Sequence, residues 1–580
     1  MFNKIKPYMG SYIRYTYAAL WTMLVSLIAS MVPFFMLYRI IRPLIDGEKL
    51  SAGYLAMHIA IIFVCELAHA NLYVLGLKFS HISAYNTLKN IRISLQKKLE
   101  RQPLGTIHDM GNGKIKKLFT DDIDQVELIL AHAIPEGISN LSLALIAIVC
   151  MFFANWKLAL LSLCSLPLGL FAMGMMFKAG MAKMNDYYAA AAKMNSTIIE
   201  YVNGMEVVKV FGRDGESYKR YENDIKSYRD FTLAWYRICW PWMALYTALI
   251  PCVALVMLPV GTMMVTKGTV SLADLVLVFC LTLSIGGPLL KALNFAGKIP
   301  QLGYKVDEIE KAMDNAPLKS ENHPFNGTSH EVKFDDVRFA YKEQEVLHGV
   351  SLELGEGTLT ALVGESGSGK STLAKLLVHY YDLNGGKISL GGQDITDMSI
   401  EALSDNISYV SQEQFLFNTT LYDNILIGKP DATREEVLAA ADKAQCSEFL
   451  ERLPKGIDTM AGDGGKQLSG GERQRISLAR AILKNAPVIV LDEATAFIDP
   501  ENEEKMNAAI GEIIHGKTVL VIAHRLQTIV NADKICVMKD GNIIAVDKHE
   551  KLLQNCEVYQ KLWNSSEARA NWTIGNEVKA

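Results

Sequence analysis

The chain has 580 residues, which is enough for two or more domains with ample cores. Its formal net charge is −4, and this near-neutral balance points to no nucleic-acid partner. Its nine cysteines occur singly, so their spacing supports neither a zinc site nor a disulfide framework. Half of the residues are hydrophobic, but the apolar runs are concentrated in the first 300 or so residues.

Six apolar segments in that half are long enough to cross a membrane, which takes about 20 residues. They lie near residues 15–41, 54–77, 134–154, 157–180, 240–266 and 271–293. The first stretch is too long for a signal peptide and lacks a small-residue cleavage site, so we expect a retained span. The pattern predicts a multi-pass protein in contact with the lipid bilayer.

The loops between these segments differ in length and charge. The loops after the second and fourth segments are long and rich in Lys and Arg, whereas the other loops are short and carry few. Excess Lys and Arg mark the cytoplasmic side of a membrane. We therefore expect both termini and both long loops to be cytoplasmic, in a cell (inner) membrane protein. Each long loop would turn near 111–113 or 212–215, where a short helix can rest on another domain.

Three ionisable residues lie within the second predicted span: His58, Glu66 and His69. On a helix they fall within an arc of about 80°. Such residues are costly in a membrane and are functional candidates. Two interpretations remain open: a polar patch that lines a substrate pathway, or a hydrogen-bonded seam between helices. We do not expect the two histidines to share a metal ion, because they lie too far apart along the helix axis.

After about residue 315 the long apolar runs end and the sequence is typical of a soluble α/β protein. We expect a transmembrane domain at 1–315, a polar linker at 316–331 and a soluble α/β domain at 332–580. Residues 364–371 read Gly-Glu-Ser-Gly-Ser-Gly-Lys-Ser, which fits the phosphate-loop pattern, and they stand between an apolar strand and a helix. Backbone N–H groups there can wrap a β-phosphate, Lys370 can pair with the β- and γ-phosphates, and Ser371 can ligate Mg²⁺.

Two further motifs belong to the same chemistry. The buried strand 488–491 ends in Asp492 and Glu493, which predicts Mg²⁺ binding through water by Asp492 and a general base at Glu493. Residues 468–472 form a small-residue turn before a helix, which is a second anion site. The signature residues in this turn, expected to reach the γ-phosphate held by a partner subunit, are Ser469, Gly470, Gly471 and Glu472.

In this order the motifs resemble those of a half-transporter of the ATP-binding cassette superfamily with the exporter-type fold. The resemblance implies a membrane α-helical bundle of six transmembrane helices fused to an α/β P-loop NTPase cassette. It implies ATP and Mg²⁺ as cofactors and a second half-transporter as partner, in a homodimer or a heterodimer. It also implies that the two loop tips are coupling helices that dock on the cassettes.

The resemblance assigns roles to further residues. Tyr341 matches the aromatic residue that stacks on adenine, Gln412 the glutamine that contacts Mg²⁺, and His524 the switch histidine on the γ-phosphate. Glu472 stands where Gln is commonest in the family. The predicted catalytic residues are Glu493, His524 and Gln412, and the Mg²⁺ residues are Ser371, Gln412 and Asp492. The predicted ATP-binding residues are Tyr341, Gly364, Gly367, Ser368, Gly369, Lys370, Ser371 and Thr372.

The amino-acid sequence of residues 492–502 is similar to that of a bacterial subgroup associated with siderophore uptake. This similarity favours import of an iron-siderophore, a small-molecule substrate. Export of a drug, lipid or peptide is the alternative. A channel or regulator gated by ATP is a remote third possibility, because the catalytic motifs are complete.

Overall fold

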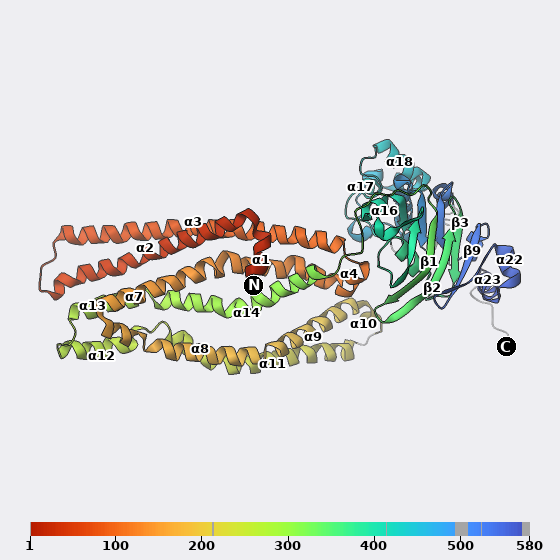
Figure 1. Cartoon of the computed structure of the whole chain (residues 1–580). Helices are drawn as coiled ribbons and strands as arrows, with labels where there is room; N and C mark the ends of the chain where they lie inside the picture. The colour runs from red at the N-terminus through yellow and green to blue at the C-terminus, as the bar shows by residue number, and fades with distance from the viewer. Residues whose placement is uncertain (1, 212–213, 413, 493–507, 524, 571–580) are drawn as a thin grey trace. The chain divides into compact units, whose positions relative to one another are not determined.

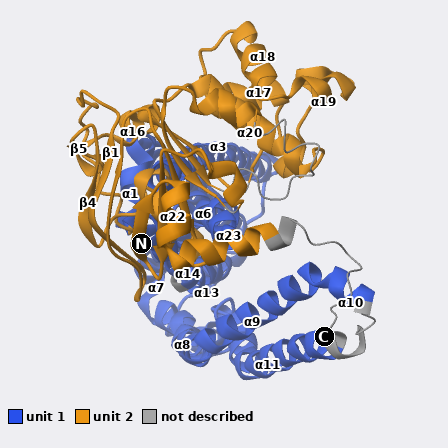
Figure 2. Ribbon diagram, turned by 90° about the vertical axis from the view of Figure 1, so that its right-hand side faces the viewer, with its two compact units in different colours: residues 1–99, 112–314 blue, residues 100–111, 315–580 orange. Residues whose placement is uncertain are grey.

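The computed structural model describes residues 2–211, 214–412, 414–492, 508–523 and 525–570. The chain forms two compact units, which Figure 2 colours separately. Unit 1 comprises Met1–Leu99 and Asn112–Asp314, and unit 2 comprises Glu100–Gly111 and Asn315–Ala580. The short segment Glu100–Gly111 comes from the loop after the second predicted span, yet it packs with the residues of unit 2.

Unit 1 is built from helices, several of them very long (Figure 1). In chain order they are α1 (Phe2–Met9), α2 (Ile13–Ile45), α3 (Ala52–Glu100), α5 (Asn112–Lys117), α6 (Ile123–Glu127), α7 (Pro135–Leu163), α8 (Ser165–Ala182), α9 (Met184–Asn203), α10 (Met205–Phe211), α11 (Asp214–Leu249), α12 (Ala254–Thr266), α13 (Leu272–Thr282) and α14 (Gly286–Asp314). Two π-helical segments, η2 (Leu118–Asp122) and η3 (Leu128–Ala133), flank α6.

Five helical stretches of the described residues are long and apolar enough to cross a membrane. A sixth is obtained if Lys219–Leu249 and Ala254–Thr266, which are bent by 40° at a short break, form one span. Large apolar side chains cover the surface of these helices; Phe63 is 68% exposed and Phe153 is 86% exposed. Surfaces of this kind need a non-aqueous cover such as a lipid bilayer.

The predicted third and fourth spans separate at Asn155, whose backbone is not helical (φ −162°, ψ 106°). Asn155 Oδ1 accepts hydrogen bonds from the backbone N–H groups of Lys157 (3.2 Å) and Leu158 (3.4 Å), as a helix N-cap does. Its amide Nδ2 donates to Asp274 Oδ2 at 3.2 Å. A break of about two residues therefore suffices to end one helix and start the next.

The described residues of unit 2 form two sheets. The first is antiparallel and has the order β2 (Gln344–Leu354), β1 (Val332–Tyr341), β4 (Gly385–Leu390), β5 (Gln393–Asp394). The second has the order β10 (Asn542–Asp547), β9 (Lys534–Lys539), β3 (Leu359–Gly364), β8 (Thr518–Ile522), β7 (Val488–Asp492), β6 (Ile407–Val410). From β9 to β6 neighbouring strands run parallel, so the carboxyl ends of β3, β7 and β6 share one edge.

The helices of unit 2 belong to different cores. Helix α15 (Lys370–Leu377) packs with both sheets in one core. A second core joins the other face of β7 to the helices α17 (Leu421–Leu426), α18 (Arg434–Lys443), α19 (Ser447–Arg452) and α20 (Gly470–Lys484). The remaining described helices are α4 (Leu104–Met110), α16 (Ile400–Asn406), α22 (His549–Asn555) and α23 (Glu557–Ala570). A sheet domain and a helical lobe thus position the two predicted anion sites.

Candidate nucleotide site

The phosphate-loop residues connect the central strand β3 to α15. Strand β3 is an almost fully buried apolar run that pairs with β8 on one side and β9 on the other. The loop ends at Gly369, which is the N-cap of α15 and has a left-handed backbone (φ +100°). A Cβ atom there would lie 2.7 Å from Leu347 Cδ2, so the position requires glycine for both conformation and space. The backbone N–H groups at the start of α15 are left to face an anion.

The side chain of Lys370 folds back over this loop. Its Nζ donates hydrogen bonds to the carbonyl oxygens of Gly364 (2.9 Å) and Glu365 (2.7 Å), and the residue is 5% exposed. A buried ammonium costs free energy unless it is hydrogen-bonded, and here the loop carbonyls satisfy it. The cation is thus held at the centre of the loop that would surround a phosphate.

Asp492, at the end of β7, is the centre of an oxygen-rich cluster. Its Oδ1 accepts a hydrogen bond from Ser371 Oγ at 3.0 Å, and its Oδ2 accepts one from Tyr409 Oη at 2.9 Å. Asp492 is 3% exposed. The parallel pairing of β6 with β7 brings Tyr409 opposite Val490, two residues before the aspartate. The sequence motifs do not indicate that Tyr409 is a partner of Asp492, because this contact depends on the order of strands.

The surroundings of Tyr409 keep its hydroxyl protonated. Burial, followed by the nearby charge of Asp492, raises the pKa of Tyr409 well above its usual value. The phenol is therefore a hydrogen-bond donor at neutral pH and orients the carboxylate of Asp492.

Tyr341, the predicted adenine-stacking residue, is the last residue of β1 and is 37% exposed. Its hydroxyl lies 3.3 Å from Thr372 Oγ1, at the start of α15. Its ring meets the ring of Tyr381 edge-on, with centroids 5.3 Å apart. One edge of Tyr341 is thus fixed against the phosphate-loop helix, and part of the ring stays open.

Tyr381 also contacts the segment of unit 2 that comes from the first long loop. A Cβ atom on Gly105 of α4 would lie 2.6 Å from Tyr381 Cε1, and Leu104 N–H donates to the carbonyl oxygen of Tyr380 at 2.9 Å. Asp109, near the end of α4, forms an ion pair with Lys342 at 3.0 Å. Helix α4 therefore rests beside the strand end that carries Tyr341.

The signature turn caps α20. Ser469 Oγ accepts from Glu472 N–H at 3.3 Å, and Glu472 Oε2 accepts from Ser469 N–H at 2.8 Å, which is a complete capping box. Ser469 and Gly470 are exposed, and a Cβ at Gly470 or Gly471 would meet nothing within 4 Å. The turn is an open helix N-terminus, and the Glu472 carboxylate is engaged with the chain's own backbone.

Of the three predicted catalytic residues, the structure describes only Gln412. Gln412 follows the end of β6, close in sequence to Tyr409. Glu493 and His524 lie outside the described residues.

The three ionisable residues of the second span are not gathered at one point. His58 is 3% exposed, and its Nδ1 lies 2.8 Å from the carbonyl oxygen of Tyr54, on the same helix. His69 faces α2, where its Nδ1 lies 2.8 Å from Ser26 Oγ. Glu66 is exposed. The two histidines are thus satisfied by helix-to-helix and local hydrogen bonds, while Glu66 lies on the surface of α3.

The fold and this site define a class: a multi-pass membrane protein with one ATP-binding cassette. Residues 16–289 match the family described as "ABC transporter transmembrane region", and residues 347–496 match the one described as "ABC transporter". The chain belongs to the ABC transporter family, with the half-transporter arrangement of one membrane region and one ATPase cassette.

Two similar proteins are mycobactin importers. The chain is 35% identical over 507 residues to the mycobactin import ATP-binding/permease protein IrtA of Mycolicibacterium smegmatis, covering 84% of this chain and 57% of that protein. It is 33% identical over 551 residues to the protein of the same name from Mycobacterium tuberculosis, covering 93% and 63%. The chain thus spans less than two thirds of the length of either protein.

Two other comparisons cover both chains almost fully. The ATP-dependent lipid A-core flippase of Chromobacterium violaceum is 30% identical over 537 residues, covering 90% of this chain and 91% of the flippase. The solved structure of a bacterial Atm1-family ABC exporter with ATP bound has a TM-score of 0.81 at 24% identity, covering 97% of this chain and 99% of that one. This likeness confirms the predicted exporter-type fold.

Proposed function

We propose that this chain is one half of a dimeric transporter that uses ATP hydrolysis to import an iron-siderophore across the cell's inner membrane. The proposed substrate rests on the similarity to two mycobactin import proteins over 84% and 93% of this chain. The amino-acid sequence of residues 492–502 supports the same substrate class.

The geometry of the phosphate loop fits ATP and Mg²⁺. A left-handed glycine at the N-cap of α15 and a centrally held Lys370 suit a polyphosphate. Ser371 Oγ and Asp492 Oδ1, 3.0 Å apart, are the hard oxygen ligands that Mg²⁺ prefers. We assign Mg²⁺ binding to Ser371, Asp492 and Gln412. A bound ion would neutralise phosphate charge there, and the hydrogen bond from Tyr409 holds the Asp492 carboxylate in place.

We assign the remaining steps from the sequence motifs. Glu493 follows the Mg²⁺ aspartate, and we assign it as the base that takes a proton from the attacking water. We assign His524 to a hydrogen bond with the γ-phosphate. The turn Ser469–Gly471 would close over the ATP of the partner subunit. Ser469 and Gly470 are exposed, and the open space beside Gly470 and Gly471 leaves room for a phosphate at the helix N-terminus.

Coupling to transport would run through α4. Its contacts with Tyr380, Tyr381 and Lys342 support a coupling helix that follows the cassette as it closes on ATP. The excess of Lys and Arg in the long loops supports a cytoplasmic location for these loops and for both termini.

The substrate path is proposed from two features of unit 1. Glu66 is an exposed carboxylate on a membrane-length helix, where an ionisable group is costly unless it has a function. A hollow of about 200 Å³ lies between α2 and α7 and is lined by Tyr17, Leu20, Trp21, Leu24, Ile138, Ser139 and Ser142. Aromatic rings with a few hydroxyls suit an amphipathic small molecule. We assign Glu66 to the path; the hydrogen bonds of His58 and His69 favour a structural seam.

Lipid translocation is the second candidate, because the lipid A-core flippase relative matches this chain over 91% of its own length. The two candidates are separated by reconstituting the full chain, with its partner if it has one, into proteoliposomes. Iron uptake from a ferric siderophore that needs ATP, together with ATPase stimulation by that chelate, would support import. Stimulation by lipid A-type lipids, movement of labelled lipid and no iron uptake would replace import by the second candidate.

A further inference from the structure

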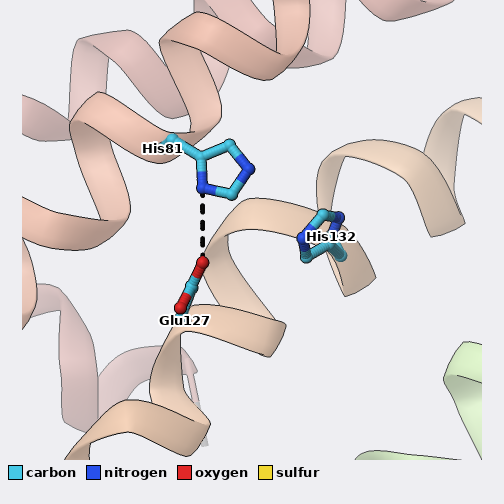
Figure 3. A group of neighbouring side chains, drawn as sticks. All are labelled: His81, Glu127 and His132. Atoms are coloured by element: carbon cyan, nitrogen blue, oxygen red, sulfur yellow. Dashed lines mark ion pairs between the residues drawn. The ribbon is translucent and has the colours of Figure 1, made fainter.

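Two histidines and a glutamate from separate elements of unit 1 converge away from the nucleotide site. His81 lies on α3, Glu127 ends α6, and His132 lies on η3 (Figure 3). One potential ligand atom from each residue lies within 4.8 Å of the other two. The residues follow the predicted second span (54–77) and precede the predicted third (134–154).

The distances suit a small metal ion. His81 Nδ1 lies 3.4 Å from Glu127 Oε1. Nitrogen and oxygen ligands placed about 2.0–2.2 Å from a tetrahedral ion are about 3.3–3.6 Å apart, so this pair already has the spacing of two ligands. The third ligand atom needs a shift on the order of 1 Å to complete the same geometry.

Neighbouring side chains orient two of the three ligands. His132 Nδ1 lies 2.6 Å from Glu136 Oε1, and Tyr85 Oη donates to Glu127 Oε1 at 3.1 Å. A carboxylate that accepts the Nδ1–H of a histidine leaves the Nε2 lone pair free to bind a metal and makes it more basic. The supporting partners of a metal-binding histidine and carboxylate are thus already present.

The backbone explains why Glu127 and His132 meet. In an α-helix, residues five apart point about 140° away from each other. Here the chain changes to π-helical geometry at Leu128, and Ile134 N–H bonds to the carbonyl oxygen of Ile129, five residues earlier. This repeat brings side chains five apart toward one face. Such π-helical turns occur frequently at functional sites.

We propose that His81, Glu127 and His132 bind one divalent first-row transition-metal ion of the Zn²⁺ or Fe²⁺ class, with water as a further ligand. Two imidazoles and a carboxylate suit these ions better than they suit Mg²⁺ or Ca²⁺. The side chains are 35%, 28% and 32% exposed, which leaves a path for the ion. The bound ion ties α3 to η3. This site does not depend on the substrate proposed above.

The test is Co²⁺ binding to the full chain in lipid nanodiscs, without nucleotide and after removal of any histidine tag. Visible absorption reports the coordination of Co²⁺, and competition with Zn²⁺ gives the affinity for zinc. We expect one ion per chain, with tetrahedral or five-coordinate absorption. His81→Ala, Glu127→Gln and His132→Ala should each weaken binding at least tenfold, and Glu136→Gln by about 10–100-fold with the same spectrum.

His330→Ala is the matched control, because His330 pairs with Glu356 at 3.3 Å on the surface of unit 2, with no third potential ligand among the described residues. It should leave the stoichiometry and the affinity unchanged. The melting temperature of the unmodified chain should rise with Zn²⁺, and this rise should disappear in Glu127→Gln, which keeps the shape of the side chain. Absence of Co²⁺ binding, or binding that all three ligand substitutions leave intact, overturns the proposal.

Discussion

Gly105 of α4 lies directly against the ring of Tyr381, and a Cβ atom on the glycine would come within 2.6 Å of Tyr381 Cε1. The same ring meets Tyr341 edge-on, with an interplanar angle of 88°. A segment from the first long loop is therefore separated by one aromatic ring from the residue predicted to stack on adenine. We propose that this packing transmits nucleotide occupancy to the loop.

Gly105→Ala should weaken transport more than ATP binding. The added methyl group must displace Tyr381 or lift α4, and overpacking of this kind costs about 1–3 kcal/mol. We expect transport per ATP hydrolysed to fall severalfold in proteoliposomes, while the affinity for ATP stays near normal. Gly53→Ala on α3, away from the loop tip, is the control, because a Cβ there would meet nothing within 4 Å. Equal transport efficiency in the two variants would contradict a coupling role for α4.

Tyr409→Phe should lower ATPase activity and raise the Mg²⁺ concentration needed for it. The change removes the hydrogen bond to Asp492 Oδ2, and a bond to a charged group contributes about 1.5–3 kcal/mol. A roughly tenfold loss at low Mg²⁺ is expected, measured as ATPase rate against Mg²⁺ concentration. Because the pKa of Tyr409 is raised, the donor stays protonated below its unperturbed pKa near 10, and the bond is lost only as pH rises through the raised value. The effect should therefore be constant from about pH 6 to 9.

Tyr380→Phe serves as the comparison, since its ring packs against Tyr409 with centroids 5.7 Å apart. No hydrogen bond from its hydroxyl is found among the residues that the structure describes. Its Mg²⁺ dependence should match that of the unmodified chain. If both variants shift alike, the loss reflects packing and not the Asp492 hydrogen bond.

Ser469→Ala should lower the stability and ATPase activity of the cassette, whereas Glu472→Gln should leave both nearly unchanged. Ser469→Ala removes the N-cap of α20 and should lower the free energy of unfolding of the cassette by about 0.5–2 kcal/mol, and ATPase activity with it. Glu472→Gln keeps an acceptor for Ser469 N–H, because Glu and Gln both complete a capping box. Thermal unfolding and ATPase rates would measure both effects. A severe ATPase loss in Glu472→Gln alone would mean that its charge acts on nucleotide and not on the cap.

Glu493→Gln should bind ATP yet hydrolyse it about 10²–10⁴-fold more slowly, the usual contribution of a general base. Nucleotide binding by equilibrium dialysis and phosphate release measured on the same preparation separate the two steps. The Asp492 cluster, which this change leaves chemically intact, should preserve Mg²⁺-dependent binding. Near-normal turnover would remove Glu493 from the role of base.

The amino-acid pattern predicted the features that depend on neighbours in the chain. Residues 359–377 form a strand, loop and helix because a buried apolar run, a glycine-rich turn and a helix-forming stretch follow one another directly. The break between the third and fourth spans was predictable for the same reason, since Asn155 caps a helix through its own following N–H groups.

The fold class also followed from sequence, because apolar segments of membrane length and the ordered cassette motifs are local signals. In the second span, His58 and His69 have hydrogen-bond partners nearby. Nothing in the spacing pointed to His81 and His132, because they lie on different helices and depend on a π-helical segment that has no simple sequence signal.

Sequence alone therefore determined what each segment is: membrane-length helices, an ATP-binding cassette and the residues of its motifs. The tertiary structure decided which distant residues meet. Parallel pairing of β6 with β7 brings Tyr409 to Asp492, and packing of α4 in unit 2 brings Gly105 to Tyr381. The physical reason is that local propensity acts over a few neighbouring residues, whereas contacts between distant residues depend on strand order and helix packing.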